Sequence, residues 1–201
     1  ASDLTLTTDS RFMIFTIHTA KAKVTELKLK KTKKEDMPLN GLGIYDIRKD
    51  ITDTVKRLKS HKVPVKWAGW LAYQCEPEKE ATPIPAGTKE SSATTGKKNE
   101  GKPKSESEDN GYHLIIRGLS AGTTDTVKFV TEYLFAEESP VLICFTTGDE
   151  KSPEPGVIVI NLKKNLRTTI YSGKGKYKQL TLAKDGERAA FIVSADEKDK
   201  A

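Results

Sequence analysis

The sequence predicts an all-β fold: a partial β-propeller of four-stranded antiparallel blades, about three and a half of them, with a short helical insertion. Two observations predict it. One phrase occurs three times along the chain, and the opening segment returns near the end. Repetition at intervals of tens of residues is typical of solenoids and propellers.

The repeated phrase has the pattern of a β-hairpin. It reads YDIRKDITDTV at residues 45–55, RGLSAGTTDTV at 117–127 and INLKKNLRTTI at 160–170. In each copy an apolar residue is followed eight positions later by a β-branched one, with a Lys, Gly or Asn turn between them. The phrase therefore predicts two strands joined by a tight turn.

A second phrase predicts the two strands that precede this hairpin. Four residues recur at a constant separation of 176 positions: Leu4, Leu6, Asp9 and Phe15 match Leu180, Leu182, Asp185 and Phe191. The turns between them, TTDSR and AKDGE, contain Asp followed by Ser or Gly, as tight turns require. Looser copies are KWAGWLAYQ at 66–74 and LFAEESPVLICF at 134–145. Joined to the hairpin, this phrase gives four strands per unit.

The two phrases divide the chain into units at about 4–58, 63–130 and 133–170, with a half-unit at 179–201. Four short antiparallel strands per repeat is the blade of a β-propeller. A β-sandwich is the alternative, but it does not explain why one phrase recurs in the same order. Since propellers have about 4–8 blades, we expect an incomplete ring and a piece of a longer protein.

Three insertions fall between the second and third strands of a unit, at about 20–40, 78–110 and 148–156. Insertions at equivalent points emerge on the same face. The first has Ala20, Val24 and Leu27 at helical spacing, which predicts a short helix before Pro38. The second, 78–110, has Ile84 as its one large aliphatic residue, so it is interpreted as a flexible low-complexity insertion. Whether it orders on a partner stays open.

The net charge of +6 is concentrated in one segment. Residues 20–36 hold seven Lys against three acidic residues, but no Arg or aromatic residue that would grip phosphate or stack on a base. A solvated lysine-rich helix is favoured over a nucleic-acid site. The sequence also has no apolar run long enough to cross a bilayer. We therefore expect neither nucleic acid nor a membrane as a partner.

Motifs for catalysis or cofactor binding are missing from the sequence. It has no GxSxG, HExxH or phosphate-binding glycine loop, and GKGK at 173–176 is interpreted as a turn. His18, His61 and His113 are scattered, and Trp67 and Trp70 flank a core hairpin, where packing is favoured over a ligand platform. No catalytic, cofactor-binding or metal-ligating residue is predicted, and no cofactor.

Cys75 and Cys144 each lie on or beside a second strand and belong to no CxxC motif. Free buried thiols are favoured, although a disulfide in an oxidising compartment stays open because sequence does not fix its geometry.

Particular strings resemble a known family. KLKKTKKEDMPLNGLGIYDI at 28–47 and RLKSHKVPVKWAGWLAYQCE at 57–76 look like the N-terminal β-propeller region of Bacteroidetes-type prolyl oligopeptidase family serine peptidases, of the dipeptidyl aminopeptidase kind. TLAKDGERAAFIVS at 181–194 is similar to the blade opening of such propellers. The resemblance spans this chain but only part of the family's length.

The resemblance implies a larger bacterial enzyme, periplasmic or secreted, in which a propeller covers a C-terminal α/β-hydrolase domain and screens peptide substrates by size. The family's catalytic Ser, Asp and His belong to that domain, so none is carried onto this chain. We therefore expect a non-catalytic fragment that gates peptide access and docks to the hydrolase domain. A stand-alone binding module for a protein or glycan is the alternative. Open strand edges would favour self-association.

Overall fold

The computed structural model describes residues 2–33, 36–77, 106–107, 109–148 and 154–194. Ten strands form one antiparallel sheet in chain order, and two more form a separate hairpin. The ten are β1 (Ser2–Leu6), β2 (Phe12–Ile17), β3 (Asn40–Asp46), β4 (Ile51–Lys62), β5 (Trp70–Cys75), β6 (Tyr112–Gly118), β7 (Thr124–Phe135), β8 (Val141–Thr146), β9 (Gly156–Asn161) and β10 (Leu166–Ser172). The hairpin comprises β11 (Lys176–Leu182) and β12 (Ala189–Ser194), and the helix α1 (Lys21–Leu29) follows β2. The predicted all-β class and short helix are confirmed.

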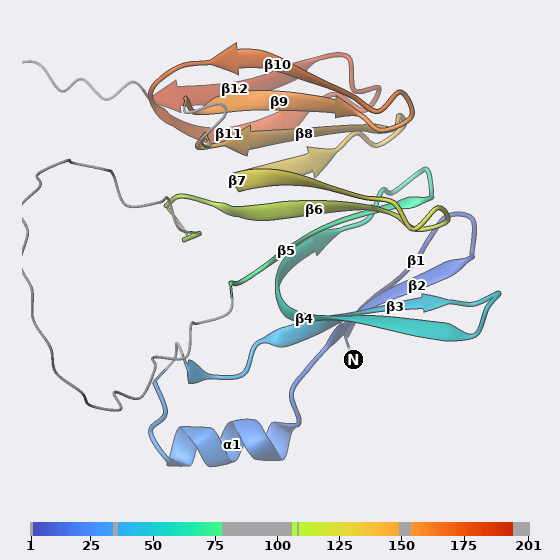
Figure 1. Cartoon of the computed structure of the whole chain (residues 1–201), viewed down its shortest axis with the longest axis vertical. Helices are drawn as coiled ribbons and strands as arrows, with labels where there is room; N and C mark the ends of the chain where they lie inside the picture. The colour runs from blue at the N-terminus through green and yellow to red at the C-terminus, as the bar shows by residue number, and fades with distance from the viewer. Residues whose placement is uncertain (1, 34–35, 78–105, 108, 149–153, 195–201) are drawn as a thin grey trace, which may run out of the picture.

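Two long strands change partner midway and divide the ten-stranded sheet. β4 pairs with β3 from Ile51 to Leu58 and with β5 from Leu58 onward. β7 pairs with β6 from Thr124 to Val130 and with β8 from Val130 onward. The halves therefore belong to different groups: unit 1 ends with the first half of β4, unit 2 with the first half of β7, and unit 3 with β10. β11 and β12 form a half-unit. Figure 1 shows these groups stacked from β1–β4 at the bottom to β8–β12 at the top.

The same backbone feature opens the first strand of every group. Asp3, Arg57, Phe129 and Gln179 all have positive φ, at 51°, 60°, 54° and 56°. At each of them the pairing register shifts, which is the mark of a β-bulge. A bulge bends a strand and increases its twist, so it lets one strand leave a sheet and begin the next.

The repeat at 176 positions is reproduced by hydrogen bonds. In the β1–β2 turn, Thr7 N donates to Phe12 O at 2.9 Å, and in the β11–β12 turn Ala183 N donates to Arg188 O at 2.8 Å. The carboxylate of Asp9 accepts from the amide two residues later, as does that of Asp185. The three-fold phrase likewise forms the β3–β4, β6–β7 and β9–β10 hairpins. Both repeats identified in the sequence are confirmed.

Three separate hydrophobic clusters lie between successive groups. The unit 1–unit 2 cluster comprises Phe12, Ile14, Leu42, Ile44, Leu58, Leu71, Tyr73 and Leu119. The unit 2–unit 3 cluster comprises Ala72, Leu114, Ile116, Val127, Val130, Tyr133, Leu142, Cys144, Ile160 and Leu162. The unit 3–half-unit cluster comprises Ile143, Phe145, Val157 and Leu180. Successive residues of β5 and β8 enter different clusters, because side chains alternate along a strand. A core on both faces of each middle unit is the packing of propeller blades, so the partial β-propeller is confirmed and the sandwich is not.

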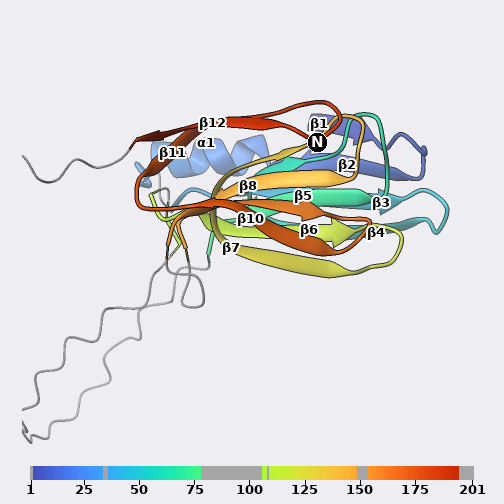
Figure 2. The same ribbon diagram turned by 90° about the horizontal axis from the view of Figure 1, so that it is seen from above.

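The three insertions connect β2 to β3, β5 to β6 and β8 to β9, as expected. α1 has no buried residue, and in both views it lies on the side where β5 ends and β6 begins (Figures 1 and 2). Most of the 78–110 insertion falls outside the described residues, so its predicted flexibility stays a prediction.

Candidate functional site

Polar side chains join the first strands of successive groups. The Ser60 hydroxyl on β4 lies 3.0 Å from the Tyr133 hydroxyl on β7, and Lys62 Nζ donates to Tyr133 O at 2.8 Å. Leu180 N on β11 donates to Glu132 Oε2 at 3.4 Å. β4, β7 and β11 therefore lie side by side, where a propeller has its central channel. We call Ser60, His61, Lys62, Glu132 and Tyr133 the inner row.

Burial is the largest cause of the pKa shifts of His61, Lys62 and Tyr133 in the inner row. It lowers the pKa of Lys62, against the opposing field of Glu132, and it lowers the pKa of His61, against that of Asp3. It raises the pKa of Tyr133 to about 12, although the hydrogen bond with Ser60 opposes the shift. Lys62 Nζ also lies 5.3 Å from the centre of the Tyr133 ring. The row can donate and accept hydrogen bonds, and its Tyr133 hydroxyl stays protonated at neutral pH.

A cavity of about 490 Å³ opens where the first strands end, and we call it the strand-end cavity. Its lining is mainly apolar and comprises Lys62, Val63, Val65, Leu134, Phe135, Ala136, Glu137, Leu180, Thr181, Leu182 and Lys184. Ion pairs frame it: Lys66 Nζ lies 2.8 Å from both Glu137 Oε1 and Glu138 Oε1, and Lys184 Nζ lies 3.3 Å from Glu137 Oε2. Hydrogen bonds from Lys66 hold the pKa of Glu137 below its ordinary value.

A cavity of about 980 Å³ lies at the opposite end, where the second half of β7 and β11 begin, and we call it the strand-start cavity. Its lining comprises Asp109, Thr131, Phe145, Thr146, Thr147, Pro155, Lys174, Gly175, Lys176, Tyr177 and Lys178. The inner row thus runs between an apolar cavity and a lysine-lined one. The GKGK segment lies in the second of these, and it forms a turn before β11, as predicted.

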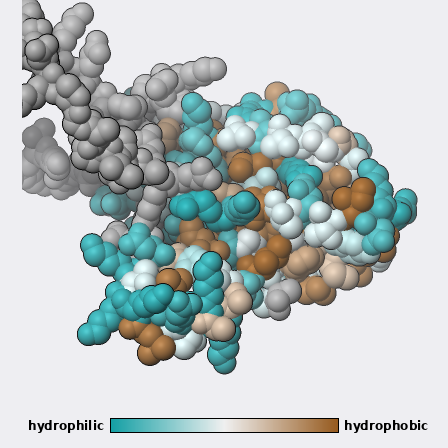
Figure 3. All heavy atoms as spheres, turned by 60° about the horizontal axis from the view of Figure 1, so that its bottom comes forward, coloured by the Kyte–Doolittle hydropathy of each residue, from teal (hydrophilic) through white to brown (hydrophobic). Residues whose placement is uncertain are grey.

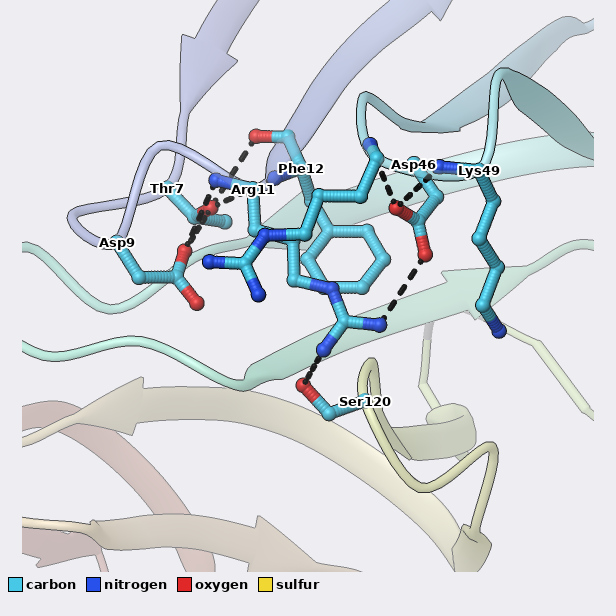
Figure 4. A network of polar contacts seen from close by, with 8 residues as sticks. Thr7, Asp9, Arg11, Phe12, Asp46, Lys49 and Ser120 are labelled. Atoms are coloured by element: carbon cyan, nitrogen blue, oxygen red, sulfur yellow. Dashed lines mark hydrogen bonds and ion pairs between the residues drawn. The ribbon is translucent and has the colours of Figure 1, made fainter.

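Arg11 ties unit 1 to unit 2 (Figure 4). Its guanidinium lies 3.3 Å from Asp46 Oδ2 and donates to Ser120 Oγ at 3.0 Å. Burial alone would raise the pKa of Asp46, but the amides of Lys49 and Arg48 together with Arg11 hold it below its ordinary value. Since Ser120 belongs to the β6–β7 hairpin, this network aligns two blades. Its role is structural.

Ser2, His18 and Asn40 are arranged like the hydroxyl, imidazole and amide groups of a hydrolytic triad. Ser2 Oγ lies 2.5 Å from His18 Nε2, and His18 Nδ1 lies 3.0 Å from Asn40 Oδ1. This group was not predicted from the sequence, because Ser2 lies on β1, His18 directly follows β2 and Asn40 begins β3. Both contacts are exposed, and none of the three residues lines a cavity described above. Acyl transfer also needs preorganised oxyanion donors and excluded water.

Cys75 and His113 lie one step beyond the Gln74–Leu114 pair of β5 and β6. Glu106 accepts from His113 N at 2.5 Å and lies 3.6 Å from its Nδ1. Burial, and secondly the charge of Glu106, raise the pKa of the Cys75 thiol, so it stays protonated at neutral pH. Both cysteines are free, as favoured from the sequence, and Cys144 is buried.

The remaining candidates have structural roles. Trp67 donates from Nε1 to Ala136 O at 2.9 Å and packs edge-on against Phe135, and Trp70 packs against the same cluster. Across the residues that the structure describes, no three His, Cys, Asp or Glu side chains gather to hold a metal ion. Within the same ranges, no helix has the length and apolarity to cross a membrane.

No family model and no curated protein matches the chain. Three solved structures are similar. The acylaminoacyl peptidase of Pyrococcus horikoshii is 12% identical over 72% of this chain and 18% of its own, with a TM-score of 0.43. The β-propeller domain of the Trilobed protease from Pyrococcus furiosus is 8% identical over 100% of this chain and 50% of its own, with a TM-score of 0.48. TolB from Acinetobacter baumannii is 9% identical over 95% and 37%, with a TM-score of 0.44. The chain spans half or less of each of these structures.

Proposed function

We propose that this chain is the non-catalytic N-terminal propeller fragment of a serine peptidase of the prolyl oligopeptidase family. In that role it gates peptide access and docks to an α/β-hydrolase domain outside the sequence, in a periplasmic or secreted bacterial protein. The supporting observation is the inner row, which follows the first strands between two cavities and carries hydrogen-bonding groups at Ser60, Lys62 and Tyr133. The strings at 28–47 and 57–76 add the family resemblance.

The two tasks belong to different parts of the site. A peptide passing along the inner row would exchange its water for hydrogen bonds to Ser60, Lys62 and Tyr133, which favours extended chains over folded ones. Docking belongs to the strand-end cavity, because an apolar centre within a polar rim is the composition of protein interfaces. Val65 in its lining is 71% exposed.

The first test is hydrolysis. We expect the chain to cleave neither peptide nor p-nitrophenyl ester substrates above a blank, and Ser2→Ala to behave identically, because the Ser2–His18–Asn40 group is exposed to water and lines neither described cavity. Turnover that a serine-directed inhibitor and Ser2→Ala both abolish would contradict a non-catalytic role.

The second test is docking of the hydrolase domain encoded downstream, supplied as a separate polypeptide and measured by calorimetry. Val65→Glu should weaken binding about tenfold or more, because a charge enters an apolar contact. Ile51→Glu, at a residue 58% exposed in the β3–β4 hairpin, is the matched control and should leave binding unchanged. If both variants weaken binding equally, the strand-end cavity is not part of the docking interface.

The second candidate function is the stand-alone binding module for a protein or glycan. The lysine-lined strand-start cavity favours it, because residues of this chain alone form that cavity. It predicts a monodisperse monomer at high concentration. The fragment predicts association through the free edge of β12, which in the described structure pairs with β11 alone. Sedimentation of the purified chain separates the two functions.

A further inference from the structure

The strand-start cavity gathers three lysines from one short segment. Lys174 lines it from the turn before β11, and Lys176 and Lys178 line it from the start of that strand. All three side chains are exposed, and no carboxylate among the described residues forms an ion pair with them. Asp109 is the single acidic residue of the lining. A hollow lined by charges of one sign concentrates ligands of the opposite sign.

A free strand edge borders the same cavity. β11 pairs with β12 along one edge, and among the described residues no strand forms a ladder with the other, although Leu180 N donates to Glu132 Oε2 on β7. Thr131 at the start of the second half of β7 lines the cavity too, so the hollow extends from β11 towards β7. An extended peptide can add to such an edge through main-chain hydrogen bonds, with its alternate side chains providing specificity.

The spacing of the lysines fits such a peptide. Lys176 and Lys178 are two residues apart on β11, so their side chains leave the same face, opposite that of Tyr177, about 6.6–6.8 Å apart along the strand. Acidic residues at alternate positions of an added strand have the same spacing. Cross-strand pairs of opposite charge stabilise neighbouring strands.

The aromatic floor argues against a nucleic acid. Phe145 is 1% exposed and packs against the Tyr177 ring at a centroid distance of 5.6 Å. The Tyr177 hydroxyl lies 2.6 Å from Gly173 O and donates to it. Since Phe145 is buried and Tyr177 is tied down at its hydroxyl, the floor offers no open platform on which bases could stack. The lining also has no Arg to fork onto a phosphate.

We propose that the strand-start cavity binds an extended acidic peptide along the free edge of β11, with carboxylates at alternate positions facing Lys176 and Lys178. The inference stands apart from the proposed peptidase role, because it needs no hydrolase domain. Exposed ion pairs are screened by salt, so binding is weak and falls as the ionic strength rises.

The test uses the full chain and fluorescein-labelled hexapeptides, with binding followed by fluorescence anisotropy at low salt. The probe alternates Glu and Thr. One control peptide has the same composition with three Glu followed by three Thr, and another replaces each Glu by Gln. We expect the alternating peptide to bind about threefold or more tighter than the block isomer, because only its carboxylates match the lysine spacing. The Gln peptide should not bind.

The variants locate the site. Lys176→Glu with Lys178→Glu should weaken binding of the alternating peptide about tenfold or more, and the Gln pair at the same positions should weaken it less. Lys163→Glu with Lys164→Glu, in the β9–β10 turn, makes the same charge change outside the cavity and should have little effect. Thermal unfolding verifies that each variant folds. Equal losses in both Glu pairs, equal binding of the block isomer, or equally tight binding of an oligothymidylate would overturn the proposal.

Discussion

Tyr133 of the inner row is a buried residue whose pKa makes the stability of the fold depend on pH. It is 3% exposed, and its hydroxyl contacts Ser60. Burial raises its pKa to about 12, whereas the pKa of a tyrosine in the unfolded chain lies near 10.0. Between these values the unfolded chain binds fewer protons than the folded one, so stability falls as the pH rises.

We therefore expect Tyr133 to contribute an alkaline loss of about 2–3 kcal/mol between pH 10 and 12. Tyr133→Phe keeps the ring, so the variant starts about 1 kcal/mol less stable through the lost hydrogen bond, but it should lose less stability over that range. Urea unfolding at pH 9 and 11.5 measures both. Tyr171→Phe, at a tyrosine 43% exposed, is the control. Parallel pH profiles for wild type and Tyr133→Phe would contradict the assignment.

For single residues, the sequence predicted which side chains pack in the core better than it predicted polar contacts between strands. Packing was predicted correctly for Trp70, which lies against the unit 2–unit 3 cluster, and the cysteines are free, as favoured. The Ser2–His18–Asn40 group was missed because His18 was judged by its sequence neighbours. Its partners Ser2 and Asn40 lie on the neighbouring strands β1 and β3. The registers of the β1–β2 and β2–β3 pairs place them beside His18, and these registers were not predicted from the sequence.

At the scale of the elements, the β-bulge near the start of each group's first strand requires a residue with positive φ. Gln179 has φ 56° and is exposed, so its side chain makes little packing contribution. Gln179→Val should destabilise the fold by about 1–2 kcal/mol, since a β-branched residue resists positive φ. Lys178→Val, at the preceding position of the same strand, is the matched control and should change stability little. Chemical unfolding gives the comparison, and equal effects would remove the bulge as a constraint.

The bulges show why the hairpins were predictable and the points of partner exchange were not. Turn residues signal a hairpin through their side chains, as Asp9 and Asp185 do by binding the amide two residues on. The bulge positions carry Asp, Arg, Phe and Gln, which share no local preference. The units drawn from the sequence therefore place residues 56–58 within one unit, whereas the pairing of β4 changes there.

For the whole molecule, unit 1 has an open face. Leu4 and Leu6 are 59% and 48% exposed, whereas Leu180, the copy of Leu4, is 5% exposed against unit 3. Figure 3, with the unit 1 side turned forward, shows hydrophobic patches among hydrophilic ones on this side. An exposed apolar face of this kind favours association.

Leu4→Lys with Leu6→Glu should therefore weaken self-association of the chain about tenfold or more, as measured by light scattering over a concentration series. Leu166→Lys with Ile170→Glu places the same charges on β10, where both residues are also exposed, and serves as control. A chain that stays monomeric before any substitution would instead support the stand-alone module.

The central claim is that each pair of successive blades encloses its own core. The most direct measurement is a methyl nuclear Overhauser spectrum of the chain labelled at Ile, Leu and Val. The account predicts cross-peaks within each cluster, such as Ile14 to Leu71 and Leu114 to Leu142, and none between Ile14 and Ile143, which belong to the first and third clusters. A single methyl network joining Ile14 to Ile143 would show one shared core, as in a sandwich, and would contradict the propeller.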